Sequence, residues 1–317
     1  MKPRLHPRPL ASRGLFREVT IRVPGTTANC GAGFDSLGLA LSIYNTVTLT
    51  RGDWTGARPA GPSDTHGLEM ADEAAGLFFV RAGVEEVGYT LAIRGEVPMS
   101  RGLGSSVTLR AGVVAALNEL TGAKLTKDDI CSLVTQLEGH PDNATPAVIG
   151  GFCVARCDAH TGELLGVLRK PIGRDLAFVV ASPGQELETK KARGILPKEL
   201  PFFDAIKSVN SATYLVAAFL SGEYDRLRHS LKDFLHEPYR LPLIPGAKSA
   251  IEAGVATGAL TGWLSGSGSS VLCVARPKVA AKVGRAMVAA FAAHKLPATV
   301  HVLHADNDGL LVDKRVF

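Results

Sequence analysis

The sequence predicts an α+β fold in two domains, and three observations carry this prediction. The chain has 317 residues, about the length of two ordinary domains, and 46% of them are hydrophobic, which is enough for buried cores. Helical and strand patterns are mixed along the chain, without the steady strand–helix alternation of a doubly wound sheet. Two strand-like runs also flank a glycine-rich turn at residues 265–270.

The first half of the chain predicts one domain over residues 18–168, after a basic, flexible extension of residues 1–17 whose composition would also fit a targeting peptide. Alternating apolar residues predict strands, and apolar residues at helical spacing predict helices. Residues 54–65 are rich in Gly, Pro and Ala and indicate a surface loop, whereas the polar residues 138–143 indicate a turn. The expected strands are 16–23, 44–50, 89–93 and the end of 147–156, residues 37–41 are expected to form a strand or a short helix, and the expected helices are 64–80, 107–120 and 127–137.

The second half predicts a domain over residues 169–317. Its first strong element is a buried strand at 176–182, because that run is continuously apolar. Further strands are expected at 260–265, 271–275, 298–304 and 310–312, and helices at 189–195, 204–220, 223–235, 248–256 and 278–294.

The charge distribution argues against a nucleic-acid partner. The net charge of +5 lies entirely in residues 1–22, which hold six basic residues and one acidic residue. The rest of the chain is balanced, unlike a domain with a basic binding face. No apolar run approaches the roughly 18–20 residues that span a bilayer, so no membrane partner is expected. The five scattered cysteines favour reduced thiols and a cytoplasmic location.

Residues 98–106 form a glycine-rich loop between a strand-like run and a long apolar helix. Gly102 and Gly104 allow a tight turn and a close approach to a ligand. Ser105 and Ser106 begin the helix, where free N–H groups and the helix dipole favour a phosphate. The loop lacks the Gly-Lys-Ser/Thr ending of a Walker A motif. We expect it to hold the triphosphate of ATP, although an ordinary capped turn would have a similar composition.

Two other loops, residues 24–35 and 265–270, have the same small, glycine-rich composition. The order and residues of the three loops resemble the motifs of the galactokinase–homoserine kinase–mevalonate kinase–phosphomevalonate kinase (GHMP) superfamily. The resemblance is strongest to the homoserine kinases, and it is most discriminating at Glu138-Gly139-His140-Pro141-Asp142-Asn143. Residues 187–197 and 237–246 match further blocks of that family. The resemblance covers residues 19–312.

The resemblance implies a ribosomal-protein-S5-like first domain, which binds ATP, and a ferredoxin-like second domain, with the active site between them. It also implies Mg²⁺ and transfer of the γ-phosphoryl group to the hydroxyl of L-homoserine, a step of threonine biosynthesis. A homodimer is typical of the family.

The resemblance also assigns roles by position. Substrate binding falls to Asn29, Asp35, His140, Thr189, Arg193 and Arg240, with Asp35 on the α-ammonium and the arginines on the α-carboxylate. It implies that Ser106 and Glu138 coordinate Mg²⁺. The implied catalytic residues are Asn143, Asp142, Ser106 and Glu138. ATP falls to Pro98, Met99, Ser100, Arg101, Gly102, Leu103, Gly104, Ser105 and Ser106. Whether Asp142 acts as a base or the transfer is direct stays open.

Several positions depart from the family pattern. Gln136 stands where a second acidic residue is common, and Thr108 and Ser269 replace Ala and Pro. In the first loop, the family usually has Ala, Ser, Leu and Pro where this chain has Gly25, Thr27, Cys30 and Ala32. Most of these differences exchange one small residue for another. These departures bear on affinity more than on reaction class. Two alternatives remain on other grounds: a kinase for another small alcohol such as mevalonate, or a catalytically silent nucleotide-binding regulator.

Overall fold

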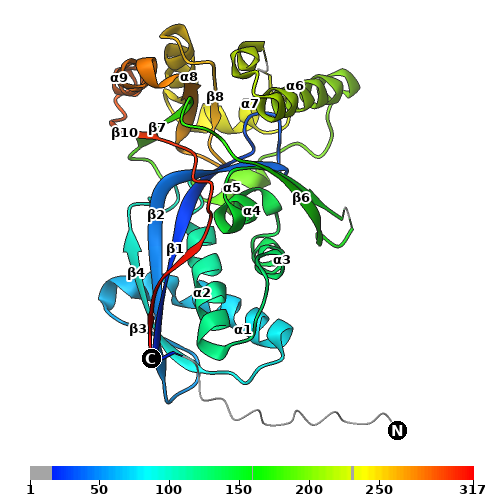
Figure 1. Cartoon of the computed structure of the whole chain (residues 1–317). Helices are drawn as coiled ribbons and strands as arrows, with labels where there is room; N and C mark the ends of the chain where they lie inside the picture. Colours follow the sequence, from blue (N-terminus) through cyan, green and yellow to red (C-terminus); the bar gives the residue numbers. More distant parts are fainter. Residues whose placement is uncertain (1–15, 159, 230–231) are drawn as a thin grey trace.

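The computed structural model describes residues 16–158, 160–229 and 232–317, except for the side chains of Thr189 and Lys190. It has two units, each with its own sheet (Figure 1). The predicted α+β class is confirmed. The expected extension, residues 1–17, lies outside the described residues up to residue 15. No helix in the described ranges is long and apolar enough to cross a membrane.

The first unit is built on a seven-stranded sheet with the central order β11-β1-β2-β4-β3. Its long strands β1 (Glu18–Ala28) and β2 (Leu37–Gly52) pair antiparallel, with a register shift at Pro24/Gly25. Residues 37–41, expected as a strand or a short helix, are thus strand, and they are continuous with the expected strand 44–50. The remaining strands are β3 (Ala57–Pro59), β4 (Gly88–Gly95), β5 (Phe152–Cys157), β6 (Leu164–Lys170) and β11 (Leu311–Val316).

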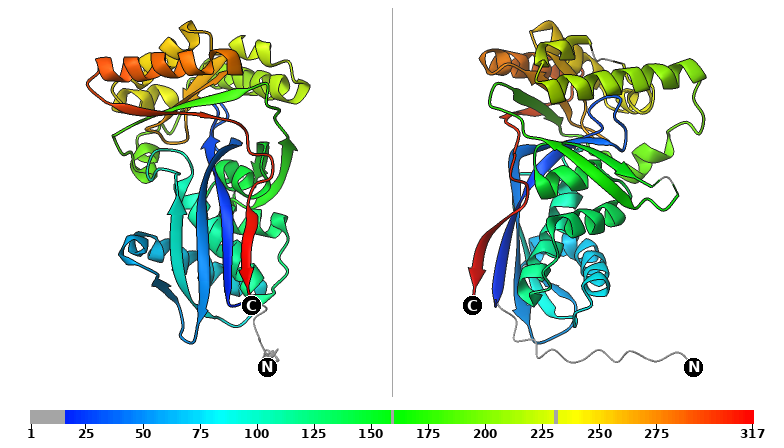
Figure 2. Two further views of the ribbon diagram at one scale, coloured as in Figure 1. Left: turned by 60° about the vertical axis from the view of Figure 1, so that its left-hand side comes forward. Right: turned by 45° about the vertical axis from the view of Figure 1, so that its right-hand side comes forward.

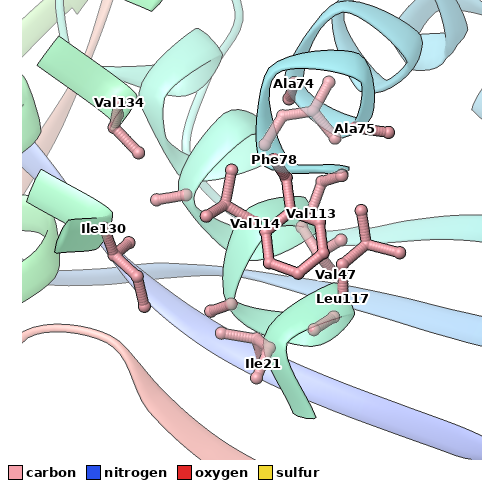
Figure 3. Close-up of a cluster of buried hydrophobic side chains, with 14 of the residues drawn as sticks. Ile21, Val47, Ala74, Ala75, Phe78, Val113, Val114, Leu117, Ile130 and Val134 are labelled. Atoms are coloured by element: carbon pink, nitrogen blue, oxygen red, sulfur yellow. The ribbon is translucent and has the colours of Figure 1, made fainter. Parts of the chain in front are cut away.

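Helices cover one face of this sheet (Figure 2). They are α1 (Leu68–Ala82), α2 (Ser105–Thr121), α3 (Lys127–Glu138) and α4 (Pro141–Ile149), with the 3₁₀ helix η1 (Pro62–Gly67) before α1. Apolar side chains of β1, β2 and α1–α3 interlock between the layers, and Ile21, Val47, Phe78, Val113 and Leu117 are fully buried (Figure 3). Helix α2 is apolar nearly all round because it lies in the middle of this core.

The second unit has a four-stranded antiparallel sheet with the order β10-β7-β9-β8. Its strands are β7 (Ala177–Pro183), β8 (Thr261–Leu264), β9 (Val271–Ala275) and β10 (Ala298–Leu303). Its helices are α5 (Thr189–Gly194), α6 (Phe202–Ser221), α7 (Glu237–Arg240), α8 (Ala247–Ala256) and α9 (Pro277–Ala293), with short 3₁₀ helices η2 (Tyr224–His229) and η3 (Leu241–Leu243). This β-α-β-β-α-β order is the ferredoxin-like arrangement.

The two faces of the second sheet pack against different partners. Val179 and Cys273 face a cluster with α8 and α9, whereas Phe178 and Leu272 face a cluster that includes Leu39 of β2. Because side chains alternate along a strand, one sheet can serve both cores. The second cluster joins the two units and fixes the loops between them.

Five expectations need correction. Helix α4 begins at Pro141, within the segment where we expect a turn, because proline is tolerated at the first helical position. Strand β11 pairs with β1, so the last strand of the expected second domain, residues 169–317, lies in the first sheet. The expected boundary between the two domains, at residues 168 and 169, lies inside β6. The loop expected at 54–65 contains β3, and the helix expected at 223–235 is the 3₁₀ helix η2 up to His229, with residues 230–231 outside the described ranges.

Candidate active site

The three glycine-rich loops meet between the two units. The expected first loop, residues 24–35, begins within β1, which extends to Ala28. From this end of β1, the Thr26 N–H donates to the Leu103 carbonyl of the second loop, and the Ala28 carbonyl accepts from the Gly266 N–H of the third. The Ser265 hydroxyl lies 2.7 Å from the Gly102 carbonyl oxygen. The convergence that we expect of these loops is therefore present.

Gly102 and Gly104 are required by this packing. Both have positive φ angles, 72° and 71°, and a Cβ at Gly102 would lie 2.1 Å from the Ser265 carbonyl oxygen. A Cβ at Gly104 would lie 2.2 Å from the Thr26 hydroxyl. Only glycine fits both the conformation and the space.

A cavity of about 320 Å³ opens where the loops meet. The start of α2 lines it with Ser105 and Ser106, so the unpaired N–H groups of that helix end lie at the cavity. This arrangement suits an anion. Of the residues expected to hold ATP, Met99, Ser100, Gly102, Gly104, Ser105 and Ser106 line the cavity.

Three residues expected to hold ATP do not line this cavity. Leu103 is buried in the core between the units, and Arg101 donates to the Gly184 carbonyl at 2.9 Å and pairs with Glu186. Pro98 precedes the turn and is half-buried. These residues shape the loop rather than its ligand-facing surface.

All four expected catalytic residues line the cavity. The Ser106 hydroxyl donates to Glu138 Oε2 at 3.1 Å, and Arg110 Nη1 donates to Glu138 Oε1 at 2.7 Å. Ser106 and Arg110 are one helical turn apart on α2, so they hold the same carboxylate from one face. Gln136 lies elsewhere and lines a separate pocket beside β6.

Asp142 and Asn143 lie in the first turn of α4. Asp142 is only 2% exposed, and its Oδ1 lies 2.6 Å from His140 Nδ1 and accepts from the Asn143 N–H. Burial lowers the pKa of His140, but the charge and hydrogen bond of Asp142 outweigh burial and raise it overall. The Asn143 side-chain oxygen accepts from the Thr26 hydroxyl at 2.7 Å.

The charged residues expected to bind substrate gather at the same cavity. Arg193 on α5 donates from both Nη atoms to the two carboxylate oxygens of Asp35, at 2.9 and 2.7 Å. One ligand atom from each of Asp35, His140 and Asp142 lies within 4.8 Å of the other two, so two carboxylates and an imidazole face the same point of the cavity. Asn29 holds the loops together, because its amide donates to the Gly266 carbonyl and its oxygen accepts from the Asp35 N–H.

Arg240 lines the cavity although it is only 2% exposed. It donates to the carbonyls of Ala192 and Gly266 at 3.1 and 3.3 Å, and it makes no ion pair with any described residue. Burial and then the nearby charge of Arg193 lower its pKa to about 10. A buried cation without a carboxylate partner is costly unless an anion binds to it.

Thr189 stands at the start of α5, and its side chain lies outside the described residues.

Two departures from the family pattern are accommodated by hydrogen bonds. The Thr108 hydroxyl donates to the Ser105 carbonyl and accepts from Asn45, and the Ser269 hydroxyl donates to the Gln185 carbonyl.

The sequence gives no separate signal for several other residues of the site. Phe34 lines the cavity beside Asp35, and the buried His236 packs on its ring. The cavity also extends over the side chains of His66, Met70, Ile93, Met99 and Leu109, from η1, α1, β4, the loop and α2. No spacing rule links these residues, since they come from separate elements of the chain.

Comparisons with known proteins show what the chain is similar to. The family described as GHMP kinases N terminal domain matches residues 69–151, and that described as GHMP kinases C terminal matches residues 215–293. A protein named homoserine kinase from Moorella thermoacetica is 36% identical over 301 residues, which cover 92% of this chain and 99% of that protein.

Solved structures show the same architecture. The crystal structure of homoserine kinase from Cytophaga hutchinsonii superimposes with a TM-score of 0.85 and 28% identity, covering 96% of this chain and 99% of that one. The L. major mevalonate kinase in complex with R-mevalonate has a TM-score of 0.68 at 17% identity, over 93% and 99% of the two chains. The latter likeness shows the fold alone.

Proposed function

Because the chain belongs to the homoserine kinase family of the GHMP kinases, we propose that it transfers the γ-phosphoryl group of ATP to the side-chain hydroxyl of L-homoserine. The product is O-phospho-L-homoserine, an intermediate of threonine biosynthesis. The observation that carries this proposal is Arg240, a buried cation at the cavity that makes no ion pair in the described part of the chain.

An amino acid supplies the charges that this end of the cavity lacks. Its α-carboxylate would meet Arg240 and Arg193, whose planar guanidinium groups match a carboxylate. Its α-ammonium would meet Asp35, beside the buried Asp142. The Asp35–Arg193 pair must open for this, and because both side chains are a third or more exposed, opening it costs little.

ATP would occupy the rest of the cavity. Its phosphates suit the second loop and the start of α2, where backbone N–H groups are free. The apolar surface of Met70, Ile93 and Leu109 suits the purine base, which the polar end would not shelter.

Ser106 and Glu138 fit a magnesium ion. Their oxygens lie 3.1 Å apart at the cavity, close to the roughly 2.9 Å between neighbouring ligands of an octahedral Mg²⁺ site. Mg²⁺ on ATP commonly takes only one or two protein oxygens, so the neutral Gln136 is no obstacle. When bound, the ion would neutralise charge on the β- and γ-phosphates.

The remaining residues position the reacting groups. Asp142 Oδ1 already faces His140 and the Asn143 N–H, so we assign Asp142 to holding His140 and the start of α4 rather than to removing the substrate proton. His140 and Asn143 would orient the hydroxyl in line with the γ-phosphorus. Phosphoryl transfer depends mainly on position and charge stabilisation, which makes direct transfer without a strong base sufficient.

A panel of alcohols assayed with Mg²⁺ and ATP tests the proposal. We expect ADP release with L-homoserine and little with mevalonate or galactose, which carry no ammonium for Asp35. Preference for mevalonate would favour the alternative superfamily kinase. Nucleotide binding without turnover of any alcohol would favour the silent regulator.

Two further expectations belong with this proposal. A homodimer is supported by exposed apolar side chains on α6, including Phe202, Phe203 and Val209, and light scattering tests it. A cytoplasmic location is supported by the need for ATP and by the unpaired state of Cys30, Cys131, Cys153, Cys157 and Cys273.

A further inference from the structure

Two like charges converge on one aromatic ring at the polar end of the cavity. Arg193 and Arg240 belong to α5 and α7 of the second unit, and Phe34 belongs to the first loop of the first unit. The Cζ atoms of the two arginines lie 5.3 and 5.2 Å from the centroid of the Phe34 ring. Asp35 offsets the charge of Arg193, but no carboxylate among the described residues pairs with Arg240.

A third side chain of the second unit holds the ring. His236 packs on Phe34 with centroids 5.4 Å apart and an interplanar angle of 30°. Its Nε2 lies 2.9 Å from the Gly31 carbonyl oxygen and donates to it, and its Nδ1 lies 3.5 Å from Arg240 Nη1. Burial, the largest influence, lowers the pKa of His236, so the neutral ring can accept at Nδ1.

The ring is well suited to hold two guanidinium groups together. The π-system of an aromatic side chain attracts cations, and the attraction grows when water is excluded. A phenylalanine also supplies a rigid surface without a hydrogen-bonding group that would compete for the substrate carboxylate. Phe34 lines the cavity, so it lies at the place where that carboxylate would meet the arginines.

We infer that Phe34 is a positioning residue that sets selectivity for alcohols carrying a carboxylate, because it fixes both Arg193 and Arg240 beside one ring. This inference rests on the proposed function. It predicts that the ring matters only for substrates on which the arginines act, and that it leaves ATP binding and the transfer step nearly unchanged.

Kinetics with two acceptors test the inference. The Phe34→Leu variant should raise KM for L-homoserine about tenfold or more, with kcat within about threefold of the wild type. Its KM for ATP should not change, nor should its low kcat/KM for 3-amino-1-propanol, which lacks the carboxylate. Phe34→Tyr keeps the ring and should restore the KM for L-homoserine.

A matched control is available away from the cavity. The ring of Phe16 contacts Arg315 in the same way, with the arginine Cζ 5.6 Å from the ring centroid. The Phe16→Leu variant should therefore leave KM and kcat unchanged for both acceptors. If Phe34→Leu lowered kcat/KM equally for L-homoserine and 3-amino-1-propanol, or lowered it for neither, the inference would be overturned. Phe34→Met serves the same purpose if Phe34→Leu does not fold.

A binding measurement separates this inference from the proposed function. L-2-aminobutyrate carries the ammonium and carboxylate of homoserine without its hydroxyl. Calorimetric titration should show weaker binding of it to Phe34→Leu than to the wild type, and unchanged binding would overturn the inference. A wild type that binds L-2-aminobutyrate but phosphorylates no homoserine would contradict the proposed function and leave the role of Phe34 standing.

Discussion

Arg193 and Asp35 form a bidentate ion pair across the two units of the protein, with N–O distances of 2.9 and 2.7 Å. One partner comes from the first loop, the other from α5, and each bears the charge opposite to one end of an amino acid. The pair is a contact between the units, and under the proposed function it occupies the place of a zwitterionic ligand. A bound amino acid would replace this one ion pair with two.

Removing either partner should weaken substrate binding. Asp35→Asn and Arg193→Gln should each raise KM for L-homoserine by about 10- to 100-fold, since a charged hydrogen bond contributes about 1.5–3 kcal/mol. Because the two residues contact each other, the free energy of substrate binding lost in the double variant should be smaller than the sum of the losses in the two single variants. Steady-state kinetics of the four proteins measure this coupling, and strict additivity would mean that the two side chains are not coupled in the free enzyme.

Arg240 should affect the amino acid and not the nucleotide. Arg240→Met keeps an apolar stem in the buried site but removes the charge, so KM for L-homoserine should rise by about 100-fold while ATP affinity stays nearly intact. Arg226→Met, at an exposed arginine paired with Glu223, is the matched control. If Arg240→Met weakened the binding of L-homoserine and of ATP equally, the assignment of Arg240 to the substrate carboxylate would be wrong.

Binding of metal at the proposed magnesium site should respond in opposite directions to two substitutions. Glu138→Gln removes the carboxylate and should weaken Mn²⁺ binding in the presence of ATP at least about tenfold, or roughly 1.4 kcal/mol. Arg110→Met removes a cation that competes for Glu138, so it should strengthen Mn²⁺ binding. Electron paramagnetic resonance of free Mn²⁺ measures both, and unchanged binding in Glu138→Gln would exclude this carboxylate as a ligand.

His140 should make stability depend on pH. Because its pKa is raised in the folded protein, its pairing with Asp142 stabilises the fold fully below the ordinary histidine pKa, about 6.5. This contribution is lost as the pH rises through the higher folded value. The stability advantage of the wild type over His140→Gln should therefore be larger at pH 6 than at pH 8. Urea unfolding at the two pH values measures it, and an advantage that grows with pH would contradict the assignment.

Much of the site could be predicted from local sequence, because its loops have a distinctive composition. Gly102 and Gly104 are demanded by close backbone packing, and that demand leaves a glycine signature in the sequence. The resemblance then places Asp35 and Arg240 together, although 205 positions of sequence separate them, and no periodicity or spacing rule could do so. The structure brings both to one cavity.

Other features could not be predicted because they depend on tertiary contacts. Helix α4 contains Pro146 and begins with Pro141, so local propensity favours a turn, yet packing between the sheet and α3 stabilises the helix. Strand β11 returns to β1 after the whole second unit has been completed. The role of Phe34 is invisible in sequence, since a single aromatic residue in a loop has no pattern.

The most direct test is the product formed from L-homoserine and ATP. ³¹P NMR with purified protein and Mg²⁺ should show a new phosphomonoester signal that grows in step with ADP and matches O-phospho-L-homoserine. Release of ADP without that signal, or no homoserine-dependent release at all, would contradict the proposal that this chain is a homoserine kinase.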